Sequence, residues 1–222
     1  MNTEPVSQTS DHPERPRSSA IVIPDAVDFR TRVERGEKIC APDLFAKKQP
    51  LEIEIGCGKG RFALQRAQEN PGINIIAFDK LWKFLKRRKA SADRQDLPNL
   101  VYFKAEAGLF LDKAVPDESV SIFHLYFPDP WPKRKHHYRR TFDLAFLKTV
   151  WNKTKSGGFF EIATDFEEYY QVMMKVIAAQ KDWELIRETV NERFFAPTCL
   201  TNYELKYQAE GRKLHYIELQ KV

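Results

Sequence analysis

The sequence predicts an α/β fold built on a doubly wound, mostly parallel sheet. Two observations support this prediction. Short apolar runs alternate with helix-like stretches from residue 51 onward, and a glycine-rich turn joins the first such run to the first helix. Strands that alternate with helices form parallel sheets covered on both faces. The chain has 222 residues, which is about the size of one domain.

The N-terminal residues differ in composition from the rest of the chain. Residues 1–20 are rich in Pro, Ser, Glu and Arg and offer few side chains to bury, so a disordered tail is predicted there. Residues 21–222 are predicted to form a single domain. Between the tail and residue 51, we expect Val27, Phe29, Leu44 and Phe45 to pack onto that domain.

The first half of the domain contains three predicted strands, over residues 51–55, 74–78 and 100–104. A helix is predicted over 61–69, and it ends at an Asn-Pro-Gly sequence because proline and glycine stop helices. A strongly basic helix is predicted over 81–93.

The second half continues the alternation of strands and helices. Strands are predicted over 120–127, 159–163, 183–190 and 214–219, and helices over 143–154 and 166–180. A turn at Gly157-Gly158 is expected to join the first of these helices to the strand at 159.

Three glycines, Gly56, Gly58 and Gly60, fall within five residues directly after the strand 51–55. Such a turn lets the backbone approach a ligand and points helix N–H groups at it. The G-x-G-x-G spacing differs from the G-x-G-x-x-G dinucleotide fingerprint. Glu54, just before the turn, would repel a pyrophosphate and attract a cation, which suits S-adenosylmethionine. A helix-entry turn without a ligand is the alternative.

Two further acids follow the next two strands. Asp79 ends the second strand, where an acid in doubly wound folds binds ribose hydroxyls. Glu106 follows the third strand together with Ala107, where an acid could accept a hydrogen bond from the amine of adenine. Each acid also fits the simpler role of a helix N-cap, and for Asp79 the two roles are compatible.

The most informative stretch is residues 127–134, Phe-Pro-Asp-Pro-Trp-Pro-Lys-Arg. Proline fixes its own φ and biases the preceding residue to extended geometry, so Asp129 is held at a strand end, where α/β folds bind ligands. An anchored carboxylate, the large ring of Trp131 and the cations that follow suggest a site for RNA. The Trp131 ring could stack on a base or pack within the turn.

Two basic tracts fit an anionic partner, in line with the net charge of +5. The first runs from Lys133 to Arg140 and adjoins Asp129, which favours contact with RNA. For the second, a solvated helix face is as good an explanation as RNA binding; it comprises Lys80, Lys83, Lys86, Arg87, Arg88, Lys89 and Arg94.

Several classes of protein are disfavoured by the sequence. No apolar run reaches the ~20 residues that span a bilayer, and the first residues have no secretory signal, so a cytoplasmic protein without a membrane partner is predicted. Cys40, Cys57 and Cys199 are too far apart for a disulfide framework or a zinc site. His136 and His137 are adjacent and point apart, so no metal is expected.

Four stretches together resemble one family: LEIEIGCGKG at 51–60, FPDPWPKRKHHYRR at 127–140, ATDFEEY at 163–169 and TNYELKYQAEGR at 201–212. The glycine motif is similar to that of class I S-adenosylmethionine-dependent methyltransferases. The other three stretches narrow the resemblance to the tRNA (guanine-N7-)-methyltransferases of the TrmB type. The resemblance covers residue 43 to the C-terminus and implies a Rossmann-like sheet of seven strands with an antiparallel last strand.

The resemblance also implies roles for individual residues. Donor-binding residues of the family fall on Glu54, Gly56, Gly58, Asp79, Glu106, Ala107 and Asp129. Substrate-binding residues fall on Lys133, Asp165, Thr201, Asn202, Tyr203 and Glu204, and the RNA-contacting tract falls on Lys135, His136, His137, Tyr138, Arg139 and Arg140. Two acids depart from the family pattern, because Asp79 stands where Glu is usual and Glu106 where Asp is frequent. Each change keeps the charge and alters the reach by one methylene.

The implied reaction is methyl transfer from S-adenosylmethionine to N7 of a guanine in the tRNA variable loop, at tRNA position 46. Because N7 has a free lone pair, no general base is needed and alignment supplies most of the catalysis. Asp129 is the first candidate for the catalytic carboxylate that stabilises the developing purine cation, and Asp165 is the second. Methylation of another RNA site or of a protein, and RNA binding without catalysis, are the alternatives. A monomer and a homodimer both agree with the sequence.

Overall fold

The computed structural model describes residues 28–81, residue 83 and residues 96–222. The tail predicted over residues 1–20 lies outside this range, as do Val27 and most of the basic helix predicted over 81–93. In the described part of the chain, no helix combines the length and the apolar character needed to cross a membrane.

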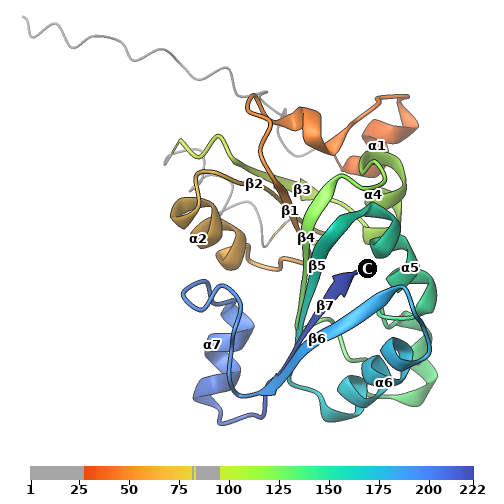
Figure 1. Cartoon of the computed structure of the whole chain (residues 1–222). Coiled ribbons are helices and arrows are strands. Elements are labelled where there is room, and N and C mark those ends of the chain that lie inside the picture. The colour runs from red at the N-terminus through yellow and green to blue at the C-terminus, as the bar shows by residue number, and fades with distance from the viewer. Residues whose placement is uncertain (1–27, 82, 84–95) are drawn as a thin grey trace, which may run out of the picture.

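A sheet of seven strands forms the centre of the molecule (Figure 1). Its order is β3 (Leu100–Lys104), β2 (Asn74–Asp79), β1 (Leu51–Ile55), β4 (Val120–Tyr126), β5 (Thr154–Thr164), β7 (His215–Lys221) and β6 (Trp183–Val190). The first five strands in that order are parallel, and β7 runs antiparallel to both of its neighbours. The prediction of a mostly parallel, seven-stranded sheet with an antiparallel last strand is therefore confirmed.

Helices cover both faces of this sheet. One face carries α2 (Arg61–Glu69) and α7 (Asn202–Ala209), and the other carries α4 (Ala107–Ala114), α5 (Leu144–Lys153) and α6 (Glu167–Ala178) (Figure 1). Before β1, α1 (Phe29–Glu34) packs against α4 and is followed by the 3-10 helix η1 (Ala41–Leu44). A second 3-10 helix, η2 (Arg134–Arg139), lies between β4 and α5. Phe29 and Phe45 are buried, as predicted.

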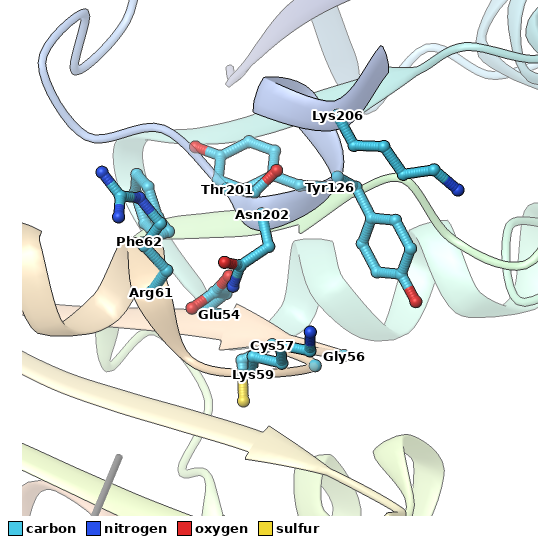
Figure 2. A pocket seen from close by; sticks show the side chains of 12 residues that line it. Glu54, Gly56, Cys57, Lys59, Arg61, Phe62, Tyr126, Thr201, Asn202 and Lys206 are labelled. Atoms are coloured by element: carbon cyan, nitrogen blue, oxygen red, sulfur yellow. The ribbon is translucent and has the colours of Figure 1, made fainter. Parts of the chain in front are cut away.

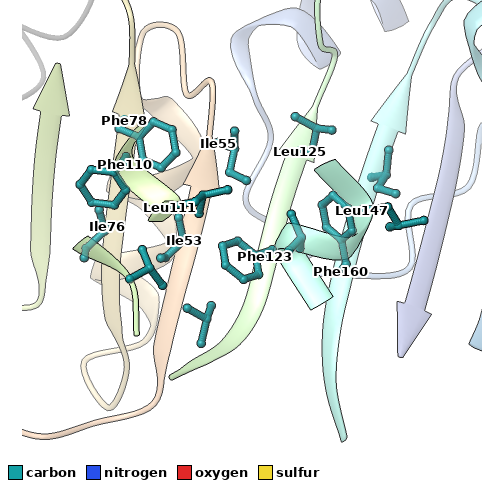
Figure 3. Packing of buried hydrophobic residues seen from close by; sticks show 14 of the residues in the cluster. Ile53, Ile55, Ile76, Phe78, Phe110, Leu111, Phe123, Leu125, Leu147 and Phe160 are labelled. Atoms are coloured by element: carbon teal, nitrogen blue, oxygen red, sulfur yellow. The ribbon is translucent and has the colours of Figure 1, made fainter. Parts of the chain in front are cut away.

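The largest apolar core lies between the sheet and the helices α4, α5 and α6 (Figure 3). The ring centroid of Phe110 on α4 lies 4.7 Å from that of Phe78 and 5.3 Å from that of Phe103. All five residues of β1 are buried, as expected for a central parallel strand covered on both faces. This core holds the ends of β1, β2 and β4 at one edge of the sheet, where the glycine turn begins.

The strand β5 begins at Thr154, five residues earlier than predicted. The pair Gly157-Gly158 forms an irregularity inside this strand, because its register with β4 shifts between Val120 and the next paired residue. A Cβ on Gly158 would lie 2.8 Å from the carbonyl oxygen of Ser121, so only a glycine fits beside β4 here. The glycines therefore mark a bulge rather than the predicted turn.

The sequence does not predict helices α4 and α7, each of which has eight residues. Both begin at a capping side chain: Glu106 caps α4, and Thr201 and Glu204 form a capping box at the start of α7. These capping residues lie in stretches assigned to ligand binding. A capping acid and a ligand-binding acid look alike in sequence, which explains the omission.

Candidate active site

The glycine turn adopts a conformation that glycine accepts more readily than other residues. Gly56, Gly58 and Gly60 have φ of 72°, 53° and 65°, in the left-handed region. The Gly56 N–H donates to the carbonyl of Phe78 on β2 at 2.9 Å. A Cβ on Gly60 would lie 2.7 Å from the ring of Tyr102, whereas one on Gly56 would meet no atom within 4 Å. The turn is therefore fixed against the sheet on one side and open on the other.

A cavity of about 260 Å³ lies between this turn and the start of α7 (Figure 2). Its lining residues come from β1, the turn, α2, β4 and α7, and they are Glu54, Gly56, Cys57, Gly58, Lys59, Arg61, Phe62, Tyr126, Thr201, Asn202, Tyr203 and Lys206. The Asn202 side chain points from α7 toward the turn. A Cβ on Gly58 would lie 3.7 Å from the ring of Tyr203. Two motifs far apart in the sequence thus enclose one site.

Glu54 places a buried carboxylate at the floor of this cavity. The residue is 3% exposed, and its oxygen Oε2 has no hydrogen-bond partner. Burial raises the pKa of Glu54 to about 8. A buried carboxyl oxygen without a hydrogen-bond partner is costly unless a ligand supplies one. The cavity therefore favours a ligand that presents a hydrogen-bond donor, and a cationic donor most of all.

Positively charged side chains line the same cavity. Lys59, Arg61 and Lys206 all contribute, and the Nε atom of Arg61 is buried without a hydrogen-bond partner. A bound ammonium group would hold the Glu54 carboxyl group in its ionised form, and these cations would attract a carboxylate, so the cavity suits a ligand that carries both groups. The amino-acid part of S-adenosylmethionine carries both, so the residues of this cavity fit that molecule.

Asp79 ties the end of β2 to the glycine turn. Its Oδ2 accepts the Gly58 N–H at 2.9 Å, and its Oδ1 accepts the Leu81 N–H at 2.8 Å, as an N-cap does. Glu106 accepts two N–H groups of the first turn of α4, at 3.0 and 2.9 Å, and Ala107 is the first residue of that helix. The capping interpretation of Glu106 is thereby confirmed. Neither Asp79 nor Glu106 lines the cavity, and their contacts with ribose and adenine stay predictions.

The corner that follows β4 is strained on both sides of Asp129. The strand ends at Tyr126 because Phe127 has a φ of 52°, and Trp131 has a φ of 44°. Left-handed backbone costs such residues on the order of 1 kcal/mol or more. The Phe127 N–H donates to the Ala163 carbonyl of β5 at 2.7 Å, which anchors the start of the corner.

Asp129 itself is open to solvent. Its side chain is 70% exposed, and its Oδ2 lies 3.8 Å from Nζ of Lys80, the residue that follows Asp79. Asp129 does not line the cavity, but this contact places it beside the end of β2. The structure therefore brings Asp129 to the same edge of the sheet as the glycine turn. It does not enclose Asp129 and the glycine turn in one pocket.

The two consecutive arginines of the basic tract have different surroundings. Arg139 is exposed, and its guanidinium carbon lies 4.9 Å from the ring centre of Trp131 and 5.4 Å from that of Tyr138. Arg140 is 6% exposed at its side chain and donates from Nε to the Pro130 carbonyl at 2.8 Å. The other members of the tract are Lys133, Arg134, Lys135 and Tyr138, which are exposed, and His136 and His137, which are half-buried.

Two acids predicted to bind the substrate are engaged by arginines. Asp165 accepts from Arg212 at 2.7 Å, and its side chain is 11% exposed. Glu204 is fully buried and accepts from Arg193 at 2.7 Å and from the hydroxyl of Tyr216 at 2.7 Å. Of the four residues predicted to contact substrate at the start of α7, the first three line the cavity. The Glu204 carboxylate instead lies beneath them and holds the helix in place.

Six lining residues were not predicted as site residues: Cys57 and Lys59 within the glycine turn, and Arg61, Phe62, Tyr126 and Lys206 outside it. Arg61 and Phe62 begin the helix that follows the glycine turn, so their position next to that motif was an available signal. Lys206 lies one helical turn after Asn202 and would share its face in a predicted α7. For Tyr126, its place at the end of a strand was the one sequence signal.

A network of buried ionisable groups supports the cavity wall at Tyr126. The ring of His124 lies 3.1 Å from Oε2 of Glu52 and 2.9 Å from Oε2 of Glu161, which also accepts from the Tyr126 hydroxyl at 2.8 Å. Burial alone would lower the pKa of His124, but the two glutamates outweigh it and raise the pKa to about 9. For Glu52, His124 and Arg66 likewise outweigh burial and hold the pKa at about 2. Within the described residues, no group of His, Cys, Asp and Glu is arranged to hold a metal ion.

Solved structures share this fold. The 16S rRNA methyltransferase KamB superposes with a TM-score of 0.62 at 14% identity, over 88% of this chain and 95% of that one. TrmN from Thermus thermophilus superposes with a TM-score of 0.57 at 17% identity, over 78% of this chain and 45% of that one. At such identities the likeness concerns the fold alone, and the fold is that of class I methyltransferases.

Sequence comparison defines the family. Residues 48–217 match a family described as putative methyltransferases. A tRNA (guanine-N(7)-)-methyltransferase of Psychromonas ingrahamii is 32% identical over 77% of this chain and 69% of that protein. One of Mesoplasma florum is 33% identical over 85% of this chain and 89% of that protein. With most of its length matched in this way, the chain belongs to the tRNA (guanine-N7-)-methyltransferase family, of the TrmB type.

Proposed function

We propose that this protein transfers a methyl group from S-adenosylmethionine to N7 of a guanine in tRNA, forming 7-methylguanosine, and that this guanine stands at tRNA position 46 in the variable loop. The observation that carries the proposal is the cavity in which the unpaired carboxylate of Glu54 faces the start of α7. Family membership and the position of the Asp129 corner at the same edge of the sheet add support.

The donor site is built from the ends of neighbouring strands. Glu54 supplies a buried acceptor for an ammonium group, and the open side of the glycine turn allows close approach of the backbone. Each carboxylate oxygen of Asp79 already accepts one hydrogen bond and has a second lone pair for a ribose hydroxyl. Glu106 with Ala107 is assigned to the adenine. When bound, S-adenosylmethionine supplies an activated methyl group on its sulfonium.

The chain has no need to supply a general base, because guanine N7 carries a lone pair and no proton. Its task is to hold N7 in line with the methyl group. Positive charge moves onto the purine during transfer, and a carboxylate beside the ring stabilises it and accepts from N1–H and N2–H₂. We assign this role to Asp129, with Asp165 as the second acid. Their ion partners, Lys80 and Arg212, have exposed side chains that a substrate can displace.

The basic tract provides affinity for the RNA backbone. Lys133, Lys135, Tyr138 and Arg139 are all exposed on or beside η2. Phosphate contacts from such residues position the RNA without reading its sequence. Residues 201–203 line the cavity, and we assign them to contacts with the target nucleoside.

The proposed substrate indicates where the protein works. tRNA is a cytoplasmic molecule, and we propose that the protein works in the cytoplasm. The described residues surround one sheet, which supports a single catalytic domain within residues 21–222. The oligomeric state, monomer or homodimer, stays a prediction.

The proposal is tested with bulk tRNA from cells that lack the gene. Incubation with the protein and methyl-labelled S-adenosylmethionine should place label in 7-methylguanosine, and a transcript with adenine at tRNA position 46 should take up none. Label in another nucleoside or in protein would favour a different class I methyltransferase activity. RNA binding without label would indicate a non-enzymatic RNA-binding protein.

A further inference from the structure

We propose that Arg140 is a positioning residue, which holds the Asp129 corner against helix α6 and does not contact RNA. The inference rests on the proposed methyl transfer, since it concerns the placement of the carboxylate assigned to the guanine. The sequence groups Arg140 with Arg139 in one RNA-contacting tract, and the structure separates the two.

The side chain of Arg140 points into the protein. It is 6% exposed, whereas Arg139 is exposed. Its Nε donates to the Pro130 carbonyl at 2.8 Å, and a terminal nitrogen donates to Oε1 of Glu168 at 3.0 Å. Its guanidinium carbon lies 4.9 Å from the ring centre of Tyr169. A guanidinium covered on these sides has little surface left for a phosphate.

These contacts join the two segments that carry the proposed acids. Pro130 directly follows Asp129, and Glu168 lies in the first turn of α6, shortly after Asp165. The guanidinium is planar and its donors form a rigid fork, so it fixes the separation of a carbonyl and a carboxylate. Arg140 therefore determines how Asp129 stands relative to Asp165.

The Asp129 corner is fixed at two points, and Arg140 provides the second. Phe127 and Trp131 have left-handed backbone, which persists where the surrounding structure enforces it. The Phe127 N–H is bonded to β5, which fixes the start of the corner. The bond from Arg140 to the Pro130 carbonyl fixes its end. Between these points Asp129 is 70% exposed, so its position follows that of the backbone.

Arg140→Lys and Arg139→Ala make a matched pair of variants. Arg140→Lys keeps the charge and loses the fork, so we expect kcat to fall about tenfold or more, with donor affinity and the salt dependence of tRNA binding within about twofold of wild type. Arg139→Ala should instead change the binding of tRNA and its salt dependence. Its KM for tRNA should rise, and the slope of log K against log salt should become shallower by about one.

Glu168→Gln tests the contact between Arg140 and α6, at a side chain that is 53% exposed. This variant decides the question if circular dichroism shows that Arg140→Lys does not fold. We expect kcat to fall in the same direction but less, and the double variant to be no slower than Arg140→Lys alone, because both changes break one connection. Wild-type kcat in both single variants would overturn the proposal.

Arg140→Ala addresses the second half of the proposal, that Arg140 does not contact RNA. We expect it to leave the salt slope of tRNA binding unchanged, and a slope reduced as in Arg139→Ala would overturn this half. The binding measurement needs no turnover, so it stands even if the wild-type protein fails to label tRNA, which would be the failure of the proposed reaction itself.

Discussion

Glu54 lies at the floor of the donor cavity with one carboxylate oxygen unpaired, and its surroundings give the protein a pH-dependent term in its stability. Burial raises its pKa to about 8, and of the charged groups nearby His124 and Arg193 oppose that rise while Asp79 adds to it. The folded chain therefore keeps a proton there that the unfolded chain releases above its ordinary pKa of 4.5. Stability consequently falls between pH 4.5 and 8 on account of this group.

Glu54→Gln should remove this penalty, because glutamine has a similar volume and no ionisable group. We expect its free energy of unfolding to exceed that of wild type by about 1 to 3 kcal/mol at pH 8.5, with the two proteins converging toward pH 5. Calorimetric unfolding across this pH range measures the difference. The same variant should bind S-adenosylmethionine at least about tenfold more weakly. Parallel pH profiles for the two proteins would contradict the raised pKa.

Asp129→Ala should abolish turnover, because it removes the charge assigned to the developing purine cation. We expect donor affinity to stay within about tenfold, or 1.4 kcal/mol, as measured by calorimetric titration. Asp129→Asn keeps the shape and one acceptor oxygen, and it should lower kcat by roughly a hundredfold. Asp117, an exposed acid paired with Lys153 at 2.7 Å, provides the control, and Asp117→Asn should turn over normally. Normal turnover in Asp129→Ala would remove the residue from the mechanism.

Among the elements, α7 couples the cavity to the interior of the fold. Its first residues line the cavity, and its one buried side chain, Glu204, is bonded to Arg193 and Tyr216. Arg193 in turn lies against the ring of Tyr126, at 5.1 Å from the ring centre. A change beneath α7 is therefore expected to reach the substrate side of the cavity.

Glu204→Ala should destabilise the protein by about 3 kcal/mol or more in urea unfolding, because it leaves the buried Arg193 without its ion partner. It should also raise the KM for tRNA, since the start of α7 loses its capping box. Glu210→Ala, at the exposed end of the same helix, should cost less than about 1 kcal/mol. Equal losses of unfolding free energy in the two variants would show that the buried Arg193–Glu204 pair contributes no more than an exposed residue.

The elements that could be predicted from sequence are those with a strong local signal. The runs of β1, β2 and β3 are apolar and bounded by turn residues, and their ends agree with the structure to within one residue. Helix α7 gives no such signal, because Glu204 is the one residue it buries and its apolar periodicity is weak. The pair Gly157-Gly158 was interpreted as a turn because a bulge depends on the neighbouring strand, which the local sequence does not specify.

At the scale of the whole molecule, the sequence predicted the motifs of the candidate site but not the cavity that they form together. The glycine turn and residues 201–203 were both identified, and the fold brings them together around one cavity. The buried network beside that cavity was not predicted. It depends on register, because His124 on β4 is aligned with Glu161 on β5 and with Glu54 on β1, two residues after its side-chain partner Glu52. Registers between strands distant in sequence are set by the whole sheet.

The buried network predicts how the whole protein responds to alkaline pH. Because the folded pKa of His124 is raised to about 9 from 6.5, its stabilising contribution is complete below pH 6.5 and is lost as the pH rises through 9. The loss should amount to about 3 kcal/mol in the free energy of unfolding. Glu54→Gln is the suitable background, since it removes another group that titrates in this range. In that background, His124→Gln should flatten the profile between pH 6.5 and 9, and an unchanged slope would refute the assignment.

The left-handed residues beside Asp129, Phe127 and Trp131, have a consequence for directed evolution. Glycine or asparagine would relax the backbone at each position but would lose the contact of Phe127 with Tyr207 and that of Trp131 with Arg139. A screen for heat resistance alone should enrich such replacements where the relieved strain exceeds the lost packing. The same replacements would make the position of the Asp129 corner less fixed and would lower the turnover of the enzyme. Variants selected for heat resistance should therefore differ first at these two codons from variants selected for methylation.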